Sequence, residues 1–219
     1  MDKAQVLQRI KSIGIVPVVR ASSGEEALRA VAAIRAGGLP ILEITMTVPG
    51  AVQIIERIAG EYGEEVLVGA GTVLDPQTAK ECMQAGAKFV VSPALNLETI
   101  AACRAAGCPV MPGALTPTEV VQAWSAGADM VKVFPCGAVG GASYIKSLRA
   151  PLPQIELIPT GGVSLDTAAG FIKAGAAAIG VGADLVELKA IREGNPEKVT
   201  NTARAYLEIV SNTRAAMMS

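Results

Sequence analysis

One repeated unit dominates the sequence and limits the folds open to it. An amphipathic, alanine-rich segment ends in an Ala-Gly pair, and a short apolar run rich in β-branched residues follows. The pairs lie at residues 36–37, 85–86, 106–107, 126–127 and 174–175. A glycine can take the left-handed conformation that ends a helix, and a short continuous apolar run is typical of a parallel strand buried on both faces. The unit therefore predicts a helix followed by a buried parallel strand.

Eight such strands are expected, with a helical segment in most of the intervals between them. They span residues 15–19, 41–45, 66–69, 89–92, 109–111, 130–133, 155–158 and 178–181. Eight strand–helix units in about 200 residues match a (β/α)8 TIM barrel at its lower size limit. The alternative is a doubly wound open sheet, but the glycine-rich stretch at 69–74 lacks the third glycine of a dinucleotide-binding turn.

We therefore predict an α/β protein with one barrel domain over residues 1–219. A helix over residues 1–13 is expected to close the amino end of the barrel. Pro196 is expected to start a final helix over residues 196–215, because proline suits the first helical turn and apolar residues follow at helical spacing.

Charge and hydropathy exclude several partners. The 219 residues carry 19 Lys and Arg against 20 Asp and Glu, so nothing favours nucleic acid or an anionic membrane. Mean hydropathy is +0.42, yet the longest uncharged stretch, 105–118, has 14 residues and three prolines, whereas a spanning helix needs about 20 apolar residues. The four cysteines show no C-x-x-C or zinc spacing, and the first residues lack a signal peptide's apolar core. We expect a cytoplasmic protein.

The chain contains no histidine, which limits its chemistry. Serine–histidine and cysteine–histidine catalytic pairs, histidine-ligated zinc and imidazole proton transfer are excluded. We expect neither a metal nor another cofactor. Catalytic residues of a barrel gather at the carboxyl ends of its strands, so the candidates are the residues at those ends.

Two charged residues lie inside otherwise apolar strands. By alternation, Lys132 and Glu43 face the barrel interior while their apolar neighbours face the helices. Burying an ammonium group is unfavourable unless it loses its proton or gains a partner. A neutral amine attacks ketones and forms a Schiff base, and a buried carboxylate can act as general acid and base. A purely structural Lys–Glu pair is the alternative.

Further strand-end residues suggest sites for anions. Thr160, Gly161 and Gly162 end the seventh strand and Gly182 follows the eighth, where barrels commonly bind phosphate through backbone N–H groups. Tight turns alone would also explain these glycines. Arg20 and Thr72 end the first and third strands and suit a substrate carboxylate, unless Arg20 is simply a surface residue. The glycines at 137, 140 and 141 suggest a flexible loop over the site, and a thiolate role for Cys136 is not favoured without histidine.

Six motifs together resemble the class I 2-keto-3-deoxy-6-phosphogluconate (KDPG) and 4-hydroxy-2-oxoglutarate (KHG) aldolases. They are Leu-Glu-Ile-Thr at 42–45, Gly-Ala-Gly-Thr-Val at 69–73, Ser-Pro at 92–93, Met-Pro-Gly at 111–113, Lys-Val-Phe-Pro at 132–135 and Pro-Thr-Gly-Gly-Val at 159–163. The resemblance extends from Arg20 to Val186. It implies a homotrimer of (β/α)8 barrels that splits KDPG into pyruvate and glyceraldehyde 3-phosphate.

The resemblance also implies roles for individual residues. Lys132 matches the Schiff-base lysine, Glu43 the general acid and base, and Thr72 the threonine at the pyruvyl carboxylate. Phe134 packs beside the lysine, and Pro93 lies in a matched motif at the site. The paired glycines at 161–162 match the phosphate loop.

Two positions depart from the family pattern. Thr47 stands where many members have an arginine that touches the carboxylate, which shifts that contact to Arg20 and Thr72. Ala183 stands where many have a serine that meets the phosphate, which leaves backbone donors.

Three functions follow from these residues. The first is an aldolase for KDPG that also splits 4-hydroxy-2-oxoglutarate into pyruvate and glyoxylate. The second is an aldolase of the same mechanism with another 2-keto acid substrate, either the galactonate-derived epimer or an unphosphorylated acid. The third is a barrel that binds phosphate or keto acids without catalysis. In each of them the partner is a small-molecule 2-keto acid or phosphate.

Overall fold

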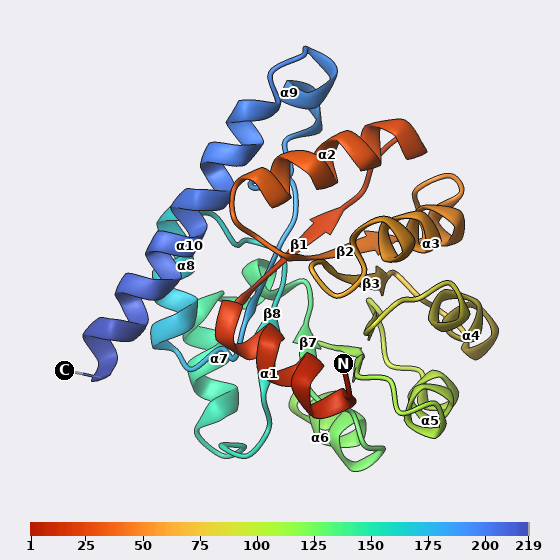
Figure 1. Ribbon diagram of the computed structural model, residues 1–219. Coiled ribbons are helices and arrows are strands. Elements are labelled where there is room, and N and C mark those ends of the chain that lie inside the picture. Colours follow the sequence, from red (N-terminus) through yellow and green to blue (C-terminus); the bar gives the residue numbers. More distant parts are fainter. Residues whose placement is uncertain (219) are drawn as a thin grey trace.

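The structure is a computed structural model that describes residues 1–218. In Figure 1, helices form a ring around curled strands, and α1 crosses in front of the strands. The helices are α1 (Lys3–Ile13), α2 (Gly24–Ala36), α3 (Ala51–Tyr62), α4 (Pro76–Gln84), α5 (Leu97–Ala105), α6 (Pro117–Ser125), α7 (Ala142–Arg149), α8 (Leu165–Lys173), α9 (Leu188–Arg192) and α10 (Pro196–Met218), with the 3-10 helix η1 (Cys136–Val139) between β7 and α7. Within residues 1–218, no helix combines the length and apolar character needed to cross a membrane.

The strands form two parallel sheets. Their bounds are β1 (Ile15–Val19), β2 (Ile41–Thr45), β3 (Leu67–Gly71), β4 (Val90–Val91), β5 (Val110–Met111), β6 (Gly113–Ala114), β7 (Val131–Val133), β8 (Leu157–Pro159) and β9 (Ile179–Val181). One sheet has the order β5-β4-β3-β2-β1-β9 and the other has the order β6-β7-β8. The prediction of a parallel α/β protein is confirmed, whereas the continuous eight-stranded barrel is found only in part.

The two sheets approach each other at two places. Pro112 alone separates β5 from β6, and a parallel bridge pairs Thr160 with Gly180. Proline has no N–H to donate to a neighbouring strand, which explains why β5 and β6 are two short strands rather than one. The carbonyl of Pro112 still accepts a hydrogen bond from the Lys132 N–H at 2.9 Å.

Most Ala-Gly pairs end their helices as predicted. Gly86, Gly107, Gly127 and Gly175 have φ between 66° and 100°, in the left-handed region that favours glycine. The first pair differs, because Gly37 has a φ of −77° and Gly38 takes the left-handed conformation instead. A Cβ on Gly37 would lie 2.5 Å from the Cβ of Ala203 in α10, so glycine is needed there for close packing.

Two apolar clusters fill the molecule. The larger lies between strands and helices, and includes Leu42, Val133 and Ile179. The smaller lies inside the curled strands and joins Val6 and Ile10 of α1 to apolar side chains from several strands. The helix predicted over residues 1–13 therefore covers the amino end of the strands, with Asp2 as its N-cap. The final helix continues past the predicted end at 215 to Met218, and Ser219 lies outside the described residues.

Candidate active site

Lys132 and Glu43 meet at the centre of the curled strands. Lys132 lies in the middle of β7, and Glu43 lies in the middle of β2. Both side chains are almost fully buried, with relative exposures of 3% for Lys132 and 2% for Glu43. The Lys132 Nζ lies 3.8 Å from the Glu43 Oε1. The structure thus brings together the two inward-facing charges that the alternation of each strand predicted.

Two glycines make room for the polar side chains. A Cβ on Gly71 would lie 2.6 Å from the Glu43 Oε1, and one on Gly180 would lie 2.2 Å from the Thr160 Oγ1. Any larger residue would displace these side chains, because Cβ contacts this short do not occur in proteins. Both glycines lie within or beside strands, where the loss of a side chain often marks a close approach. Their contribution to the site was not predicted, although glycines inside apolar runs are the signal that could have revealed it.

A small cavity lies beside the lysine and the glutamate. Its volume is about 10 Å³, and its walls include Lys132, Glu43 and Thr160. That volume suits about one water molecule. Glu43 Oε1 is buried and has no hydrogen-bond partner among the described residues, since 3.8 Å is too long for a hydrogen bond to Lys132. A buried carboxylate oxygen is therefore available to a water or a substrate hydroxyl.

Thr160 has a different position from the one predicted. We expected it to line the phosphate loop with the two glycines that follow it. The structure instead buries Thr160 in the lumen, with 4% relative exposure, on the wall of the Lys132 cavity. It still belongs to the site, but beside the reacting centre.

Phe134, Thr72 and Pro93 surround the same end of the strands. The Lys132 Nζ lies 5.4 Å from the centre of the Phe134 ring, within the range of a cation–π contact. Thr72 directly follows β3 and has a φ of 59°, an uncommon left-handed conformation for a β-branched residue. A Cβ on Gly113 would lie 2.2 Å from the Pro93 carbonyl, so those two chains also approach closely.

The Thr47 hydroxyl is hydrogen-bonded to another threonine and makes no hydrogen bond with Lys132. Its side chain is exposed, and its Oγ1 lies 2.7 Å from the Thr45 Oγ1. The Thr45 Oγ1 also bonds the Val19 carbonyl at 3.1 Å, which ties the ends of β2 and β1 together. Thr47 therefore lies at the rim, where it supports the loop after β2.

The paired glycines after β8 are held by an ordered turn. Gly161 and Gly162 have φ values of 85° and 77°, and the Gly137 N–H donates to the Gly161 carbonyl at 2.9 Å. The segment after β7 that we predicted to be a flexible loop begins with η1, which contacts the two glycines. Burial raises the pKa of the Cys136 thiol in that turn to about 11, so the thiol stays protonated.

Arg20 lies between the ends of β1 and β9. Its Nη1 is 3.4 Å from the position of a Cβ on Gly182. The side chain is exposed and forms no ion pair with any carboxylate in residues 1–218. Ala183 is also exposed in the turn that follows β9. An unpaired guanidinium therefore lies beside Gly182, one of the predicted anion-binding glycines.

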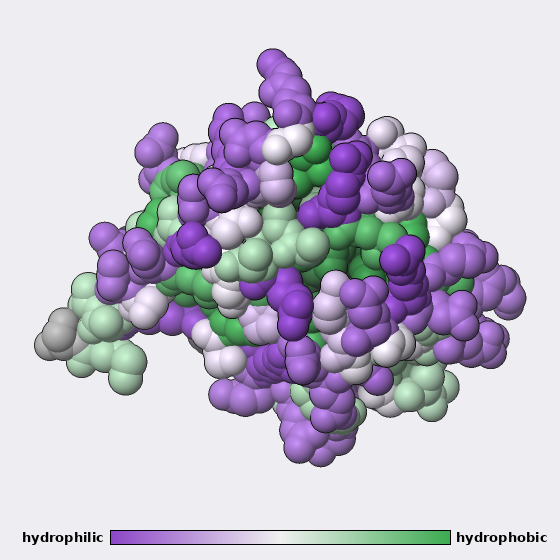
Figure 2. All heavy atoms as spheres, turned by 45° about the horizontal axis from the view of Figure 1, so that its top comes forward, coloured by the Kyte–Doolittle hydropathy of each residue, from purple (hydrophilic) through white to green (hydrophobic). Residues whose placement is uncertain are grey.

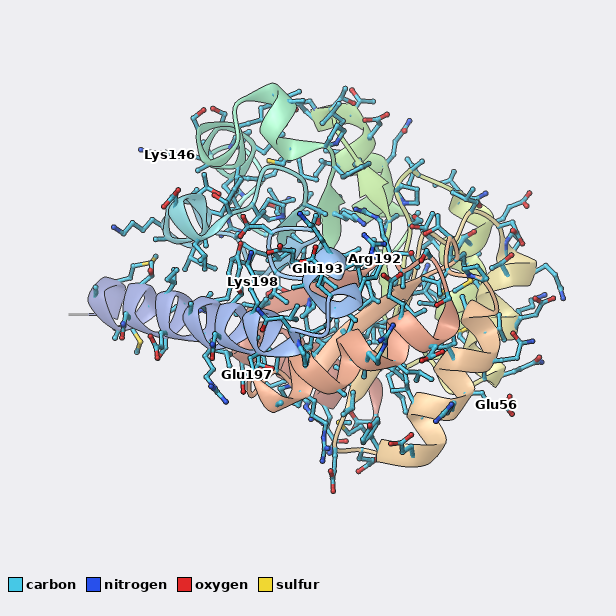
Figure 3. The ribbon with its side chains drawn as sticks, turned by 90° about the horizontal axis from the view of Figure 1, so that it is seen from above. Glu56, Lys146, Arg192, Glu193, Glu197 and Lys198 are labelled. Carbon is cyan, nitrogen blue, oxygen red and sulfur yellow. The ribbon has the colours of Figure 1, made fainter. Side chains whose placement is uncertain are left out.

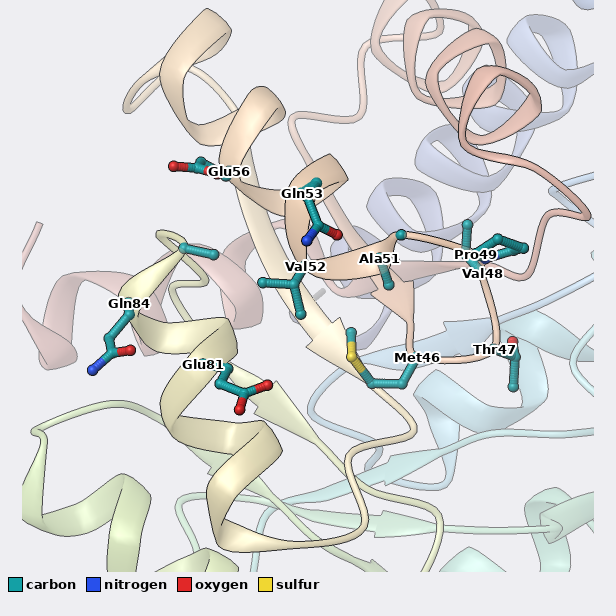
Figure 4. A pocket seen from close by; sticks show the side chains of 12 residues that line it. Met46, Thr47, Val48, Pro49, Ala51, Val52, Gln53, Glu56, Glu81 and Gln84 are labelled. Carbon is teal, nitrogen blue, oxygen red and sulfur yellow. The ribbon is translucent and has the colours of Figure 1, made fainter.

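A larger groove lies outside the strands and does not include the lysine. Figure 4 shows its walls, which come from α3, α4 and the loop after β2, with the side chains of Glu56 and Glu81 among them. Its volume is about 710 Å³. It lies between α3 and α4, and Lys132 is not among the residues that line it. Within residues 1–218, no three His, Cys, Asp or Glu side chains gather as a metal site would require.

Comparisons with known proteins agree with this arrangement. A family described as "KDPG and KHG aldolase" matches residues 6–202. The 2-dehydro-3-deoxy-phosphogluconate aldolase of Treponema pallidum is 32% identical over 94% of this chain and 97% of its own length. The 2-dehydro-3-deoxy-6-phosphogalactonate aldolase of Escherichia coli is 35% identical over 90% of this chain and 96% of its own length.

Solved structures agree as well. The KDPG aldolase of Legionella pneumophila, with pyruvate captured as a covalent carbinolamine intermediate, has a TM-score of 0.83 and 28% identity over 92% of this chain and 98% of its own. A protein cage designed by fusing symmetric oligomeric domains has a TM-score of 0.86 and 32% identity over 94% of this chain and 74% of its own. The family match and the close relatives lead to one conclusion: the chain belongs to the KDPG and KHG aldolase family.

Proposed function

We propose that this protein is a class I aldolase that splits 2-keto-3-deoxy-6-phosphogluconate into pyruvate and glyceraldehyde 3-phosphate. One observation carries the proposal, namely the buried Lys132 amine 3.8 Å from the buried Glu43 carboxylate. The amine supplies a nucleophile and the carboxylate supplies a proton acceptor, and neither role requires histidine. The relative whose structure holds pyruvate as a carbinolamine supports the same chemistry here.

The reaction begins when the Lys132 Nζ attacks the C2 carbonyl of the substrate. Loss of water gives an iminium ion. Glu43 accepts the proton of the C4 hydroxyl, directly or through one water in the adjoining cavity, and the C3–C4 bond breaks. Its electron pair moves into the iminium and forms an enamine, while the aldehyde leaves. Protonation at C3 and hydrolysis of the iminium then release pyruvate and restore the amine. A positioned acid and base of this kind contributes roughly 10²–10⁴-fold in rate.

The two ends of the substrate lie over different strands. Thr72 binds the pyruvyl carboxylate beside the reacting centre, with Phe134 and Pro93 shaping that end. Gly161, Gly162 and the turn at Gly182 and Ala183 supply backbone N–H groups to the phosphate. Arg20 adds a positive charge at this second end, since its guanidinium lies beside Gly182.

Imine trapping tests the proposed function. Incubation with pyruvate and borohydride is expected to add a stable mass to the peptide that contains Lys132, and Lys132→Met removes the adduct. A chain without any adduct would instead be a non-catalytic barrel that binds keto acids or phosphate.

Substrate range is the finer part of the proposal. We expect 4-hydroxy-2-oxoglutarate to be cleaved to pyruvate and glyoxylate by the same steps. The galactonate-derived epimer is a second candidate, because one close relative is named for it. Comparing kcat/KM for the two phosphorylated epimers and for unphosphorylated 2-keto-3-deoxygluconate decides between them.

The architecture supports one catalytic unit. We infer that the two sheets together form a closed (β/α)8 barrel, because Pro112 alone divides β5 from β6 and a bridge links Thr160 to Gly180. Residues 1–219 then form one domain, with α1 and α10 as additions to the barrel. Four reduced cysteines are consistent with function in the cytoplasm.

A homotrimer completes the proposal. Leu74 and Leu97 are more than half exposed, and the Asn96 side chain donates to the Leu74 carbonyl at 3.2 Å, so Leu74 lies beside the start of α5. Leu97 is the first residue of α5, and exposed apolar residues near one another favour an interface. The structurally similar cage of fused symmetric oligomeric domains supports this too. Light scattering is expected to give about three times 22.3 kDa, and Leu97→Asp is expected to lower that mass.

A further inference from the structure

At the phosphate end of the site, a carboxylate follows the glycine beside which Arg20 lies. Asp184 follows Gly182 by two residues and is exposed. The Gly182 carbonyl accepts hydrogen bonds from Leu185 N–H at 3.1 Å and Val186 N–H at 2.9 Å, which closes a tight turn around Asp184. Arg20 lies against the same glycine. The turn that carries Asp184 thus begins at the glycine beside the Arg20 guanidinium.

Asp184 is bound by a tyrosine instead. The Tyr206 hydroxyl donates to the Asp184 Oδ1. Tyr206 lies on α10 and its side chain is completely buried. Burial and then the bonded carboxylate raise the pKa of Tyr206 above its usual value, so the hydroxyl remains a donor. The bond draws the carboxylate towards α10, which packs on α2 and α8 outside the strands.

The neighbouring charges are already paired with other residues. Lys198 of α10 lies 2.8 Å from a carboxylate oxygen of Glu187, and Arg192 of α9 lies 3.2 Å from the buried Glu26. Figure 3 labels Lys198 and Arg192 on the helices at this side of the molecule. Asp184 itself forms no ion pair with any cation in residues 1–218. Tyr206 is therefore the group that decides where this carboxylate lies.

We propose that Tyr206 is a positioning residue for phosphate recognition: it holds Asp184 against α10 and so keeps Arg20 free to bind the substrate's phosphate. Without the hydroxyl, Asp184 pairs with Arg20 or repels the phosphate directly. The inference rests on the proposed function, because it assumes a phosphorylated substrate in this site. It concerns affinity for the phosphate and leaves the steps at Lys132 unchanged.

Three variants test the proposal. Tyr206→Phe removes one oxygen and keeps the buried ring, Asp184→Asn removes the charge, and the double variant combines them. Each is assayed with 2-keto-3-deoxy-6-phosphogluconate and with unphosphorylated 2-keto-3-deoxygluconate. Binding of inorganic phosphate is measured in parallel by calorimetry, as a readout that does not depend on turnover.

Tyr206→Phe is expected to raise KM for the phosphorylated substrate and the Kd for inorganic phosphate by roughly threefold to tenfold, the range of one exposed charge interaction. The kcat, and the KM for the unphosphorylated substrate, stay within about twofold because Lys132 and Glu43 are untouched. Asp184→Asn in the Tyr206→Phe background restores both phosphate values, since no carboxylate remains to compete. Asp184→Asn alone leaves them unchanged or improves them.

Two results would overturn the inference. Equal changes in KM for both substrates would show that Tyr206 has no specific effect on phosphate binding, and a double variant as weak as Tyr206→Phe would show that Asp184 is not the competitor. Failure of the proposed function looks different. The unmodified protein would then trap no pyruvate at Lys132, while the calorimetric comparison of phosphate binding would still decide the role of Tyr206.

Discussion

The two ends of the strands are built from contrasting residues. At the amino end, α1 covers a layer of apolar side chains that includes Ile10 and Phe89, both completely buried. The rim of that end carries ion pairs, Lys3 with Asp129 at 2.8 Å and Lys11 with Glu156 at 3.1 Å. At the carboxyl end, charged groups and glycines replace the apolar layer. Lys132 and Glu43 form a buried ion pair inside the strands there.

The amino end of the strands mainly stabilises the fold, whereas the carboxyl end carries the catalytic residues. Burial of apolar side chains stabilises the fold, and the amino end has many of them. Burial of a charge is unfavourable unless it is compensated, so the carboxyl end of the lumen contributes less to stability through burial. Figure 2 shows one face of the molecule, on which polar residues surround smaller apolar areas. The difference lies inside the strands.

The largest expected effect comes from replacing one lysine at each end of the strands with methionine. Lys132→Met removes the nucleophile and is expected to reduce kcat/KM by at least about 10³-fold, because no imine can form. Lys88 precedes β4 at the amino end and is partly exposed. Lys88→Met is therefore expected to keep kcat within about twofold. Steady-state kinetics and mass spectrometry of trapped pyruvate measure both. Appreciable turnover by Lys132→Met would remove the basis of the contrast.

The second effect is on stability at the amino end. Ile10→Ala is expected to lower the free energy of unfolding by about 2–5 kcal/mol, since it leaves a cavity in a fully packed layer. The milder Ile10→Val is expected to cost about 0.5–1.5 kcal/mol. Urea unfolding followed by Trp124 fluorescence measures both. The kcat of the folded enzyme should not change, and a parallel loss of kcat would mean that the ends are coupled.

Local signals made much of this contrast predictable. A lysine and a glutamate inside apolar runs are visible in the sequence, and alternation along a strand is enough to turn both inward. Likewise, Ala-Gly pairs before apolar runs indicated the parallel strands. The helix over 1–13 was predictable from the residues that cap and line it.

Contacts between distant segments were not predictable in the same way. Glycine is needed at position 37 because α10, more than 160 residues further along the chain, packs closely against it. Pro112 divides β5 from β6 because it has no N–H to donate to the neighbouring strand. No pattern in the sequence around Arg20 indicates that its side chain lies beside Gly182. The bond from Tyr206 to Asp184 joins a helix to a turn that no spacing rule connects.

A pair of glycines in β3 sharpens the contrast further. A Cβ on Gly69 would lie 2.2 Å from the Phe89 ring, whereas one on Gly71 would lie 2.6 Å from the Glu43 Oε1. Gly69→Ala is expected to destabilise the fold by about 1–3 kcal/mol through overpacking. Gly71→Ala displaces the movable carboxylate and is expected to lower kcat by roughly 10- to 100-fold with a smaller loss of stability, because misplaced acid–base groups lose much of their effect.

Thermal unfolding and kcat, measured on both variants, are expected to show opposite patterns. The Gly69→Ala enzyme should be less stable with a near-normal kcat, and the Gly71→Ala enzyme should be nearly as stable with a low kcat. Similar changes in thermal stability and kcat for the two variants would mean that Gly69 and Gly71 do not have separate structural and catalytic roles.

The smallest expected effect concerns how the carboxyl-end loops are held. Glu119 in the first turn of α6 accepts hydrogen bonds from the N–H groups of Leu115 and Thr116, both at 2.8 Å. These backbone bonds, first that of Thr116 and then that of Leu115, hold the pKa of Glu119 below its usual value of 4.5. Glu119→Ala is expected to lower the free energy of unfolding by about 1 kcal/mol, the usual contribution of a cap.

The effect should depend on pH with a definite sign. A carboxyl whose pKa is lowered by folding stabilises the protein above its unfolded pKa, and this contribution is lost as pH falls through the folded pKa. The difference between the unmodified protein and Glu119→Ala should thus be constant near neutrality and shrink below about pH 4.5. Glu119→Gln, which keeps an acceptor without a charge, should show a smaller, pH-independent loss. Urea unfolding from pH 3.5 to 7 measures all three proteins. A difference that grows on acidification would mean that the loop is held by packing, as at the amino end.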